Sequence, residues 1–433
     1  MKNKILTKKI TGTLALTMAI WGTASAQSSD ALIDKLVEKG ILSIKEANDL
    51  REEADKGFTQ AYSVKSGMPE WVSTLRFNGD FRARYDGIYS DIPGVVERHR
   101  ARFRLRFGAT ALLSDDFEVG LRLASAANTG GDTGGDPIST NETLGNNGNR
   151  KAIGIDMAYA KWSPINTPEW TGSFAFGKFE NPFSFSEMVF DNDYTPEGLS
   201  EQIGYRFNDQ QFLKLNLGQF VLDELGSSHK DAYMMGAQVR LDSTWNPKWQ
   251  STASIGGLSI LNPKSLTTTA VPDINKGNTR TAGVLDNDYN LVIADAAVVY
   301  NLDSFPFYEG MFPIKFGGEY IHNFGASRKN RAFGLGPTFG KAGKKGTWEF
   351  SVKYKELQAD SVYEETVDSD YGAFYPAYGS GVNARGPVYR LSYSPRDFLT
   401  FSAMYADTEL IDEVPSGAKS DGSRLIVDAV FKF

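Results

Sequence analysis

Arginine stands at every second position along one short stretch of this 433-residue chain. A looser set of arginines precedes the stretch and a single one follows it. Together these residues are Arg76, Arg82, Arg84, Arg98, Arg100, Arg102, Arg104, Arg106 and Arg122. Guanidinium groups with this spacing share one side of an extended chain. There they either attract anions and set a local electric field, or pair with carboxylates and hold another segment in place; the two roles are compatible.

Acidic side chains that could pair with these arginines gather in residues 179–197. The segment carries Glu187, Asp191, Asp193 and Glu197 among several phenylalanines. A segment so rich in aromatic residues is expected to pack rather than to extend freely into solvent. We therefore expect it to fold towards the arginines, where opposed charges would narrow and polarise a passage. The alternative is an external loop that packs on its neighbours.

The same sequence offers few residues that could form a metal site or a catalytic site. Asp191, Asn192 and Asp193 begin like a calcium-binding loop, but Pro196 stands in place of its glycine and Gln202 in place of its bidentate glutamate. The chain has no cysteine and 3 histidines, with no H-E-x-x-H spacing and no G-x-S-x-G turn. We expect no catalytic residues, no metal and no cofactor.

The arginine-bearing segments alternate polar and apolar residues, which is typical of β-strands with two different faces. Phe103, Leu105 and Phe107, for example, alternate with the arginines. Each alternating segment covers about the 9–11 residues that a tilted strand needs to cross a bilayer. The same pattern predicts sixteen strands, beginning near residues 74, 98, 117, 154, 171, 198, 212, 231, 248, 288, 313, 331, 346, 386, 397 and 422.

Short and long connections alternate between these strands. Tight turns are expected at 114–116, 208–210, 244–248 and 394–396, and long links at 126–154, 179–197, 262–288 and 361–386. This asymmetry is typical of outer-membrane barrels, and a closed barrel needs no disulfide because every strand edge is paired. We predict an all-β fold, a transmembrane antiparallel β-barrel of about 16 strands.

Aromatic residues near the strand ends fit the interfacial girdles of such a barrel. They are Trp71, Tyr85, Trp162, Trp170, Trp245, Trp249, Tyr320 and Tyr393. In a soluble secreted β protein, the alternative fold, the same side chains would form a buried core.

The N-terminal residues predict export. A basic start, a short apolar stretch and Ala24-Ser25-Ala26 before a cleavage point indicate a signal peptide over residues 1–26. Residues 27–70 are expected to form a periplasmic helical hairpin, over 29–56, and a linker, with the barrel over 71–433.

Removing the signal peptide removes four lysines and no acidic residue, so the formal charge falls from -7 to about -11. This acidity argues against a nucleic-acid partner.

The C-terminal strand also indicates an outer-membrane destination. Leu425, Val427, Ala429, Phe431 and Phe433 alternate with polar residues, and the chain ends on the last of them. A terminal strand ending in an aromatic residue resembles the signal that the outer-membrane assembly machinery recognises. The expected location is the bacterial outer membrane, in contact with lipid and lipopolysaccharide.

Several motifs resemble the bacterial putative porin family, over nearly the whole mature chain. They are LVEKGIL with EAN (36–48), RHRAR with LRFG (98–108), GDPISTN (135–141), GKFENPF (177–183) and DND followed by PEG (191–198). The resemblance implies a pore-forming outer-membrane protein. It supplies no substrate and no catalytic residues, and porins of this size are often trimers, which makes a homotrimer one expectation.

The expected function is passive diffusion of small hydrophilic solutes or ions through a water-filled barrel whose arginine-rich wall prefers anions. Two other functions stay open. One is a substrate-specific anion channel that uses the arginines as binding groups. The other is an outer-membrane enzyme, for which His322, at the end of a strand, is the one candidate base.

Overall fold

The computed structural model describes residues 69–90, 96–125, 135–268, 276–372, 381–412 and 421–433. The predicted signal peptide and helical hairpin lie outside the described residues. The chain divides into two compact units, Met1–Thr74 and Leu75–Phe433. In the first unit, the described residues form a turn, closed by a hydrogen bond from the Val72 amide to the Pro69 carbonyl, and the beginning of a strand.

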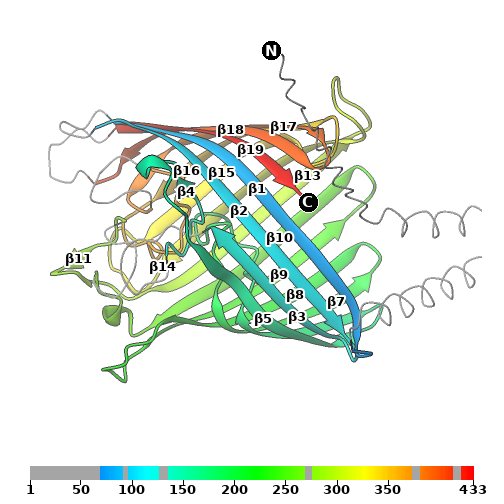
Figure 1. Ribbon diagram of the computed structural model, residues 1–433, viewed down its shortest axis with the longest axis horizontal. Helices are drawn as coiled ribbons and strands as arrows, with labels where there is room; N and C mark the ends of the chain where they lie inside the picture. Colours follow the sequence, from blue (N-terminus) through cyan, green and yellow to red (C-terminus); the bar gives the residue numbers. More distant parts are fainter. Residues whose placement is uncertain (1–68, 91–95, 126–134, 269–275, 373–380, 413–420) are drawn as a thin grey trace, which may run out of the picture. The chain divides into compact units, whose positions relative to one another are not determined.

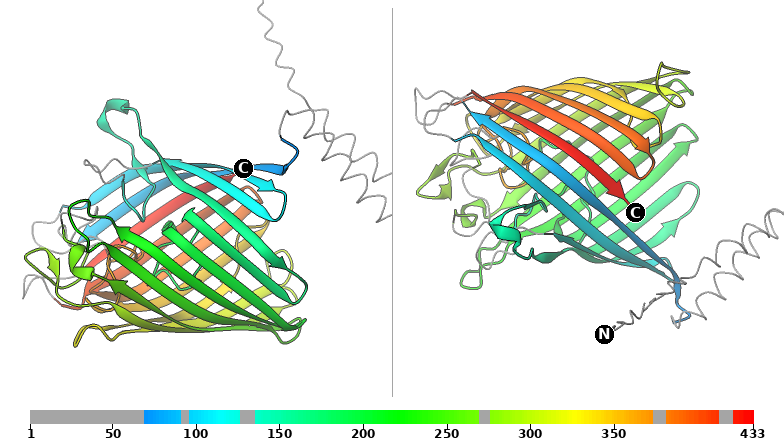
Figure 2. Two further views of the ribbon diagram at one scale, coloured as in Figure 1. Left: turned by 90° about the horizontal axis from the view of Figure 1, so that it is seen from below. Right: turned by 45° about the horizontal axis from the view of Figure 1, so that its top comes forward.

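The second unit is a closed antiparallel barrel in which each strand pairs with the next along the chain (Figures 1 and 2). Its sixteen strands are β1 (Val72–Ser90), β2 (Arg98–Leu113), β3 (Phe117–Ser125), β5 (Ile153–Asn166), β6 (Trp170–Lys178), β7 (Glu197–Asn208), β8 (Gln211–Asp223), β9 (Ala232–Thr244), β10 (Trp249–Leu261), β13 (Asn290–Leu302), β14 (Phe312–Asn323), β15 (Arg331–Gly340), β16 (Thr347–Leu357), β17 (Ala384–Arg396), β18 (Leu399–Leu410) and β19 (Asp421–Lys432). The predicted strand count is confirmed, and every predicted start lies within two residues of the observed one.

Small elements lie within the long connections. They are β4 (Glu142–Thr143), which pairs with β2, the hairpin of β11 (Arg280–Thr281) and β12 (Val284–Leu285), and two short 3-10 helices, η1 (Asn146–Gly148) and η2 (Pro263–Ser265). No helix among the described residues is long and apolar enough to cross a membrane.

The alternation of residue types separates the two faces of the barrel wall. On β1, Phe77 and Phe81 are exposed on the outer face, whereas Asp80, Arg84 and Asp86 are buried on the inner face. The aromatic residues expected at strand ends are likewise all exposed. A soluble sandwich would bury these rings in a core, so their exposure fits an apolar surface that faces lipid.

The barrel closes through pairing of β1 with β19, from Asp80 opposite Lys432 to Ser90 opposite Gly422. The last residue completes this seam, because the amides and carbonyls of Gly79 and Phe433 exchange hydrogen bonds of 2.8 and 3.1 Å. A Cβ atom at position 79 would lie 2.6 Å from the Phe433 ring, so glycine is required where the chain end packs.

Connection lengths differ between the two ends of the barrel. Tight turns such as 209–210 and 397–398 lie at one end, and long connections such as 179–196 and 262–289 lie at the other (Figure 1). This is the alternation that the sequence predicts. The long connections are therefore the segments that can reach the lumen.

Much of the lumen near the long-connection end is filled by an apolar cluster. The described residues of three connections contribute buried side chains to it, namely those between β6 and β7, between β10 and β13, and between β16 and β17. The facing strands contribute Ile293, Met404 and others. Where the inserted connections pack at this end, part of the inner wall is apolar, because these connections need apolar partners to stay folded inside the barrel.

Candidate constriction and its charged walls

Residues 179–196, here called the crossing segment, connect β6 to β7 and contact strands on opposite sides of the lumen. The side chain of Ser186 donates a 2.6 Å hydrogen bond to Glu319 on β14. Glu187 lies 2.7 Å from Lys355 on β16, whereas Asp193 lies 2.9 Å from Arg104 on β2. These contacts hold the segment across the barrel.

The arginines of β1 and β2 are neutralised first by carboxylates of the barrel wall itself. Asp80 on β1 lies 2.8 Å from Arg104 and 2.7 Å from Arg106. Asp86, four residues after Arg82 and with its side chain fully buried, pairs with Arg100, Arg102 and Arg424. Arg84 pairs at 2.8 Å with Asp428 of β19. Without such partners, the guanidinium groups on neighbouring strands would lie close enough to repel one another.

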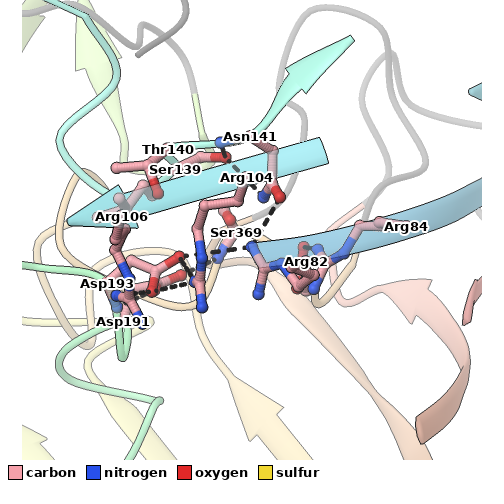
Figure 3. Close-up of polar contacts among 12 residues, drawn as sticks. Arg82, Arg84, Arg104, Arg106, Ser139, Thr140, Asn141, Asp191, Asp193 and Ser369 are labelled. Atoms are coloured by element: carbon pink, nitrogen blue, oxygen red, sulfur yellow. Dashed lines mark hydrogen bonds and ion pairs between the residues drawn. The ribbon is translucent and has the colours of Figure 1, made fainter. Parts of the chain in front are cut away.

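Inserted connections supply a second set of partners (Figure 3). Asp193 of the crossing segment contacts Arg104, Arg106 at 3.3 Å and Arg82 at 3.7 Å. Asp370, from the connection between β16 and β17, lies 2.8 Å from Arg84 and 3.2 Å from Arg424. The arginines therefore clamp two inserted connections to one wall.

A third inserted segment contacts the same wall through the motif at residues 135–141. Arg82 donates a 2.7 Å hydrogen bond to the Asn141 side chain, and Arg102 donates a 3.1 Å bond to the Asn141 carbonyl. Figure 3 shows Asn141 beside Arg82 and Arg104.

The remaining arginines of the predicted set lie apart from this cluster. Arg122 on β3 pairs with Asp156 of β5 and lies 3.4 Å from Glu180. Arg76 lies near the tight-turn end of β1 and Arg98 at the long-connection end of β2, and both are exposed. The structure thus brings together Arg82, Arg84, Arg100, Arg102, Arg104 and Arg106.

The four acidic residues expected opposite the arginines have different surroundings. Asp193 contacts them directly, as described above. Glu187 instead contacts the other wall, at Lys355 and, at 3.1 Å, Arg390. Asp191 accepts backbone hydrogen bonds from Asp193 and Ser369.

Glu197 lies outside the crossing segment, at the first position of β7. It pairs with Lys178 at 3.1 Å and is exposed. The expectation that it faces the arginines is therefore wrong, because β6 and β7 place it beside their own junction.

The pKa values of two carboxyls of the crossing segment are shifted in opposite directions. Burial raises the pKa of Asp191 well above its usual value, and the nearby charges of Asp368 and Asp193 raise it further. Burial would also raise the pKa of Glu187, but the positive charges of Lys355 and Arg390 outweigh it and hold that pKa well below its usual value.

These pKa shifts predict how acid affects the crossing segment. A carboxyl whose pKa is lowered in the folded state stabilises the fold at pH values above its unfolded-state pKa, which is about 4.3 for glutamate. This contribution is lost as the pH falls through the folded-state pKa. The Glu187 contacts should therefore persist well below pH 4.3. The effect of Asp191 on stability has the opposite sign, because its raised pKa means that protonation of this carboxyl at low pH stabilises the segment.

Glu187→Gln removes the charge that holds the segment to β16 and β17, so its current in planar bilayers should exceed that of the wild type at pH 7. We expect this difference between variant and wild type to persist from about pH 7 to about pH 4 and to disappear only in stronger acid. A difference that already disappears between pH 6 and 5 would contradict the assignment of this contact.

The crossing segment separates two cavities. The lysine-side cavity, about 360 Å³ in volume, lies between the segment and strands β9 to β16 and is lined by Arg240, Lys315 and Lys353 among others. The arginine-side cavity, about 340 Å³, is lined by Arg106 and Arg122. Phe185 and Asn192 of the segment contribute to both cavities.

Several members of this site are absent from the sequence prediction. The carboxylates Asp80 and Asp86 share the parity of Arg82 and Arg84, so their place on the inner face could have been predicted from the sequence. Lys355 and Arg390 carry no such local signal, because their partner Glu187 is remote in the chain. Among the described residues, no group of three or more potential ligands is arranged to hold a metal ion.

Residues 94–257 match the model of a family described as putative porin. The match confirms, over that part of the chain, the resemblance noted from the motifs. Together with the closed barrel, it supports an outer-membrane porin and a location in the bacterial outer membrane. No curated protein sequence matches the chain.

Several solved structures show a looser similarity. The high-pH structure of Pseudomonas putida OprB is 12% identical over 88% of this chain and 97% of that chain, with a TM-score of 0.49. A loop L8 deletion mutant of OmpT, an outer membrane protein of Vibrio cholerae, is 11% identical over 83% and 99%, with a TM-score of 0.45. A triple mutant of the Rhodopseudomonas blastica porin is 12% identical over 83% and 100%, with a TM-score of 0.42.

Proposed function

We propose that this protein is an outer-membrane porin through which small hydrophilic solutes and ions diffuse passively, with a preference for anions. The observation that carries the proposal is a closed barrel with an apolar outer face and two charge-lined cavities inside it. A solute crossing such a lumen is sorted by size and by the electric field between the walls. No bond chemistry is required, and no catalytic residue or cofactor is proposed.

The arginines divide into two roles in this proposal. Arg106 and Arg122 line the arginine-side cavity and attract anions into it. The contacts of four other arginines mainly hold the inserted connections; these are Arg82, Arg84, Arg102 and Arg104. Arg100 pairs with Asp86 of the wall, and Arg106 also contacts Asp193 of the crossing segment. Arg76 and Arg98, exposed near the two ends of the barrel, contribute to the field at its mouths.

Two alternative functions, a substrate-specific anion channel and an outer-membrane enzyme, have less support. A substrate-specific anion channel that binds its solute through the arginines would show a current that saturates with one anion, and a block by that anion that R106Q/R122Q weakens. For an enzyme, His322 would have to act as a base, yet it lies in an outer-face hollow with Tyr320 and Phe324, its ring centroid 4.4 Å from that of Phe324. This position favours an interfacial side chain.

The surroundings of the barrel follow from the same proposal. Outer-membrane lipid and lipopolysaccharide contact the apolar face. The assembly machinery recognises the C-terminal strand through Phe433, which is 63% exposed. A homotrimer, a signal peptide over residues 1–26 and a periplasmic hairpin within 27–70 complete the proposed organisation, with the barrel over 71–433.

Purified protein in a planar bilayer tests the function directly. We expect stepwise conductance and a reversal potential, under a salt gradient, that indicates anion preference. Absence of conductance steps would contradict a channel, whereas a cation preference would contradict only the proposed selectivity.

The double variant R106Q/R122Q tests the arginine-side cavity. Removing two of its positive charges should lower the anion-to-cation permeability ratio by about twofold while conductance steps persist. Asp80 and Asp193 keep Arg104 as a partner, so the wall should remain folded. R76Q, near the tight-turn end, is the matched control and should change the ratio less.

A further inference from the structure

We infer that the lysine-side cavity contains a binding subsite for small organic carboxylates, formed by Lys315 and Lys353 with Arg240 beside them. The inference rests on the proposed function, because a solute reaches this cavity only by entering the barrel. It places a solute-binding site on the wall opposite the arginines of β1 and β2.

The two lysines lie on strands that flank a third strand with small inner side chains. Lys315 lies on β14 and Lys353 on β16, with β15 between them. The positions of β15 that line the cavity include Gly334, Gly336 and Thr338, the last directly opposite Lys315 in the register. Strands two apart are separated by about 10 Å, so two ammonium groups border a trough that can admit a solute.

The positive charges of these two lysines are not neutralised by ion pairs among the described residues. Among the described residues, neither Lys315 nor Lys353 has a carboxylate within ion-pair distance, in contrast to the arginines of β1 and β2. Lys315 is exposed to the lumen. Arg240 pairs with Asp242 at 2.7 Å and donates a hydrogen bond to Ser184, so it adds a positioned positive charge.

The carboxylates that line the same cavity are already engaged. Glu319 accepts hydrogen bonds of 3.0 and 2.6 Å from the amide and hydroxyl of Ser186. Glu187 lies 2.7 Å from Lys355, and Asp295 accepts a hydrogen bond from a serine hydroxyl of β10. The lining holds four cationic side chains and three carboxylates, a formal excess of one positive charge.

The mixed lining favours an organic anion over a bare inorganic ion. Phe185, Ala297 and Val299 place apolar surface beside the lysines. A short carbon chain can contact this surface while its carboxylate groups contact the ammonium groups. A dicarboxylate suits two cations on opposite sides of a trough.

Succinate block of the chloride current tests the subsite. The full-length protein is reconstituted in a planar bilayer in potassium chloride, and succinate is added to both sides. We expect a saturable block whose half-blocking concentration rises roughly tenfold in K315Q/K353Q, because two charge contacts are lost. K315R/K353R should retain the block. K161Q, in another lumen cavity, is the matched control and should leave it unchanged.

The outcomes distinguish a failure of the proposed subsite from a failure of the proposed channel function. Conductance without succinate block, or a block that K315Q/K353Q leaves unchanged, overturns the subsite while the channel remains. Block by phosphate but not by succinate overturns the assignment to carboxylates. If the wild type does not conduct, the proposed function fails, and calorimetric titration of detergent-solubilised protein with succinate decides the subsite. Heat of binding that K315Q/K353Q abolishes supports it, and its absence in the wild type overturns it.

Discussion

Replacing Asp86 by alanine should lower the free energy of unfolding of the barrel by about 3–5 kcal/mol. The Asp86 side chain is fully buried and pairs with Arg100, Arg102 and Arg424. Without it, three closely spaced guanidinium groups lose their shared counterion and repel one another in a region from which water is largely excluded. The loss is large because one partner is removed while the buried charges that it compensates remain.

Reversible urea unfolding in lipid vesicles, followed by tryptophan fluorescence, measures this effect. Asp303→Ala is the control, because Asp303 forms an exposed pair with Lys248 at the tight-turn end and should contribute nothing measurable. If the two alanine variants had equal stability, the carboxylates of the inner wall would not be holding the arginines of β1 and β2 together.

Replacing residues 182–195 of the crossing segment by a short glycine-serine linker should raise the unit conductance by at least about twofold. The segment spans the lumen through its contacts with β2, β14 and β16, and it separates the two cavities. Its removal joins the cavities into one passage, which lowers the resistance to ions. Because the charges facing the passage are then farther apart, ion selectivity should fall as well.

Single-channel recording of this variant in a planar bilayer provides the measurement. Shortening the exposed connection at 224–231 is the control and should leave the conductance unchanged. An unchanged conductance after removal of the crossing segment would mean that the ion path lies elsewhere.

The barrel itself could be predicted from the sequence because its signals are local. The alternation of Phe103, Leu105 and Phe107 with arginines is a property of one strand, and turns such as 209–210 are bounded by polar residues. Membrane and lumen impose this alternation on nearly every strand. The pattern therefore also predicts the register of neighbours that are joined by tight turns.

The lumen could be predicted only in part, because its contacts join residues far apart in the chain. The aromatic content of residues 179–197 indicates a packed segment, but nothing local assigns Glu187 to Lys355 rather than to an arginine. The connection that carries Asp370 looks like any long external loop in the sequence. Lys315 and Lys353 lie on strands separated by β15, and no local pattern distinguishes them from other polar residues of the inner face.

The most direct test of the account is whether ions pass through the lysine-side cavity. The chain has no cysteine, so Thr338→Cys provides a single thiol on the wall of that cavity. A negatively charged thiol reagent added in a planar bilayer should reduce the current of this variant by about half or more, because it narrows the passage and opposes the lysine charges. Phe316→Cys, on the outer face of the neighbouring strand β14 and away from the cavity lining, should be unaffected. A Thr338→Cys current that persists after complete modification of the thiol would contradict a passage through this cavity.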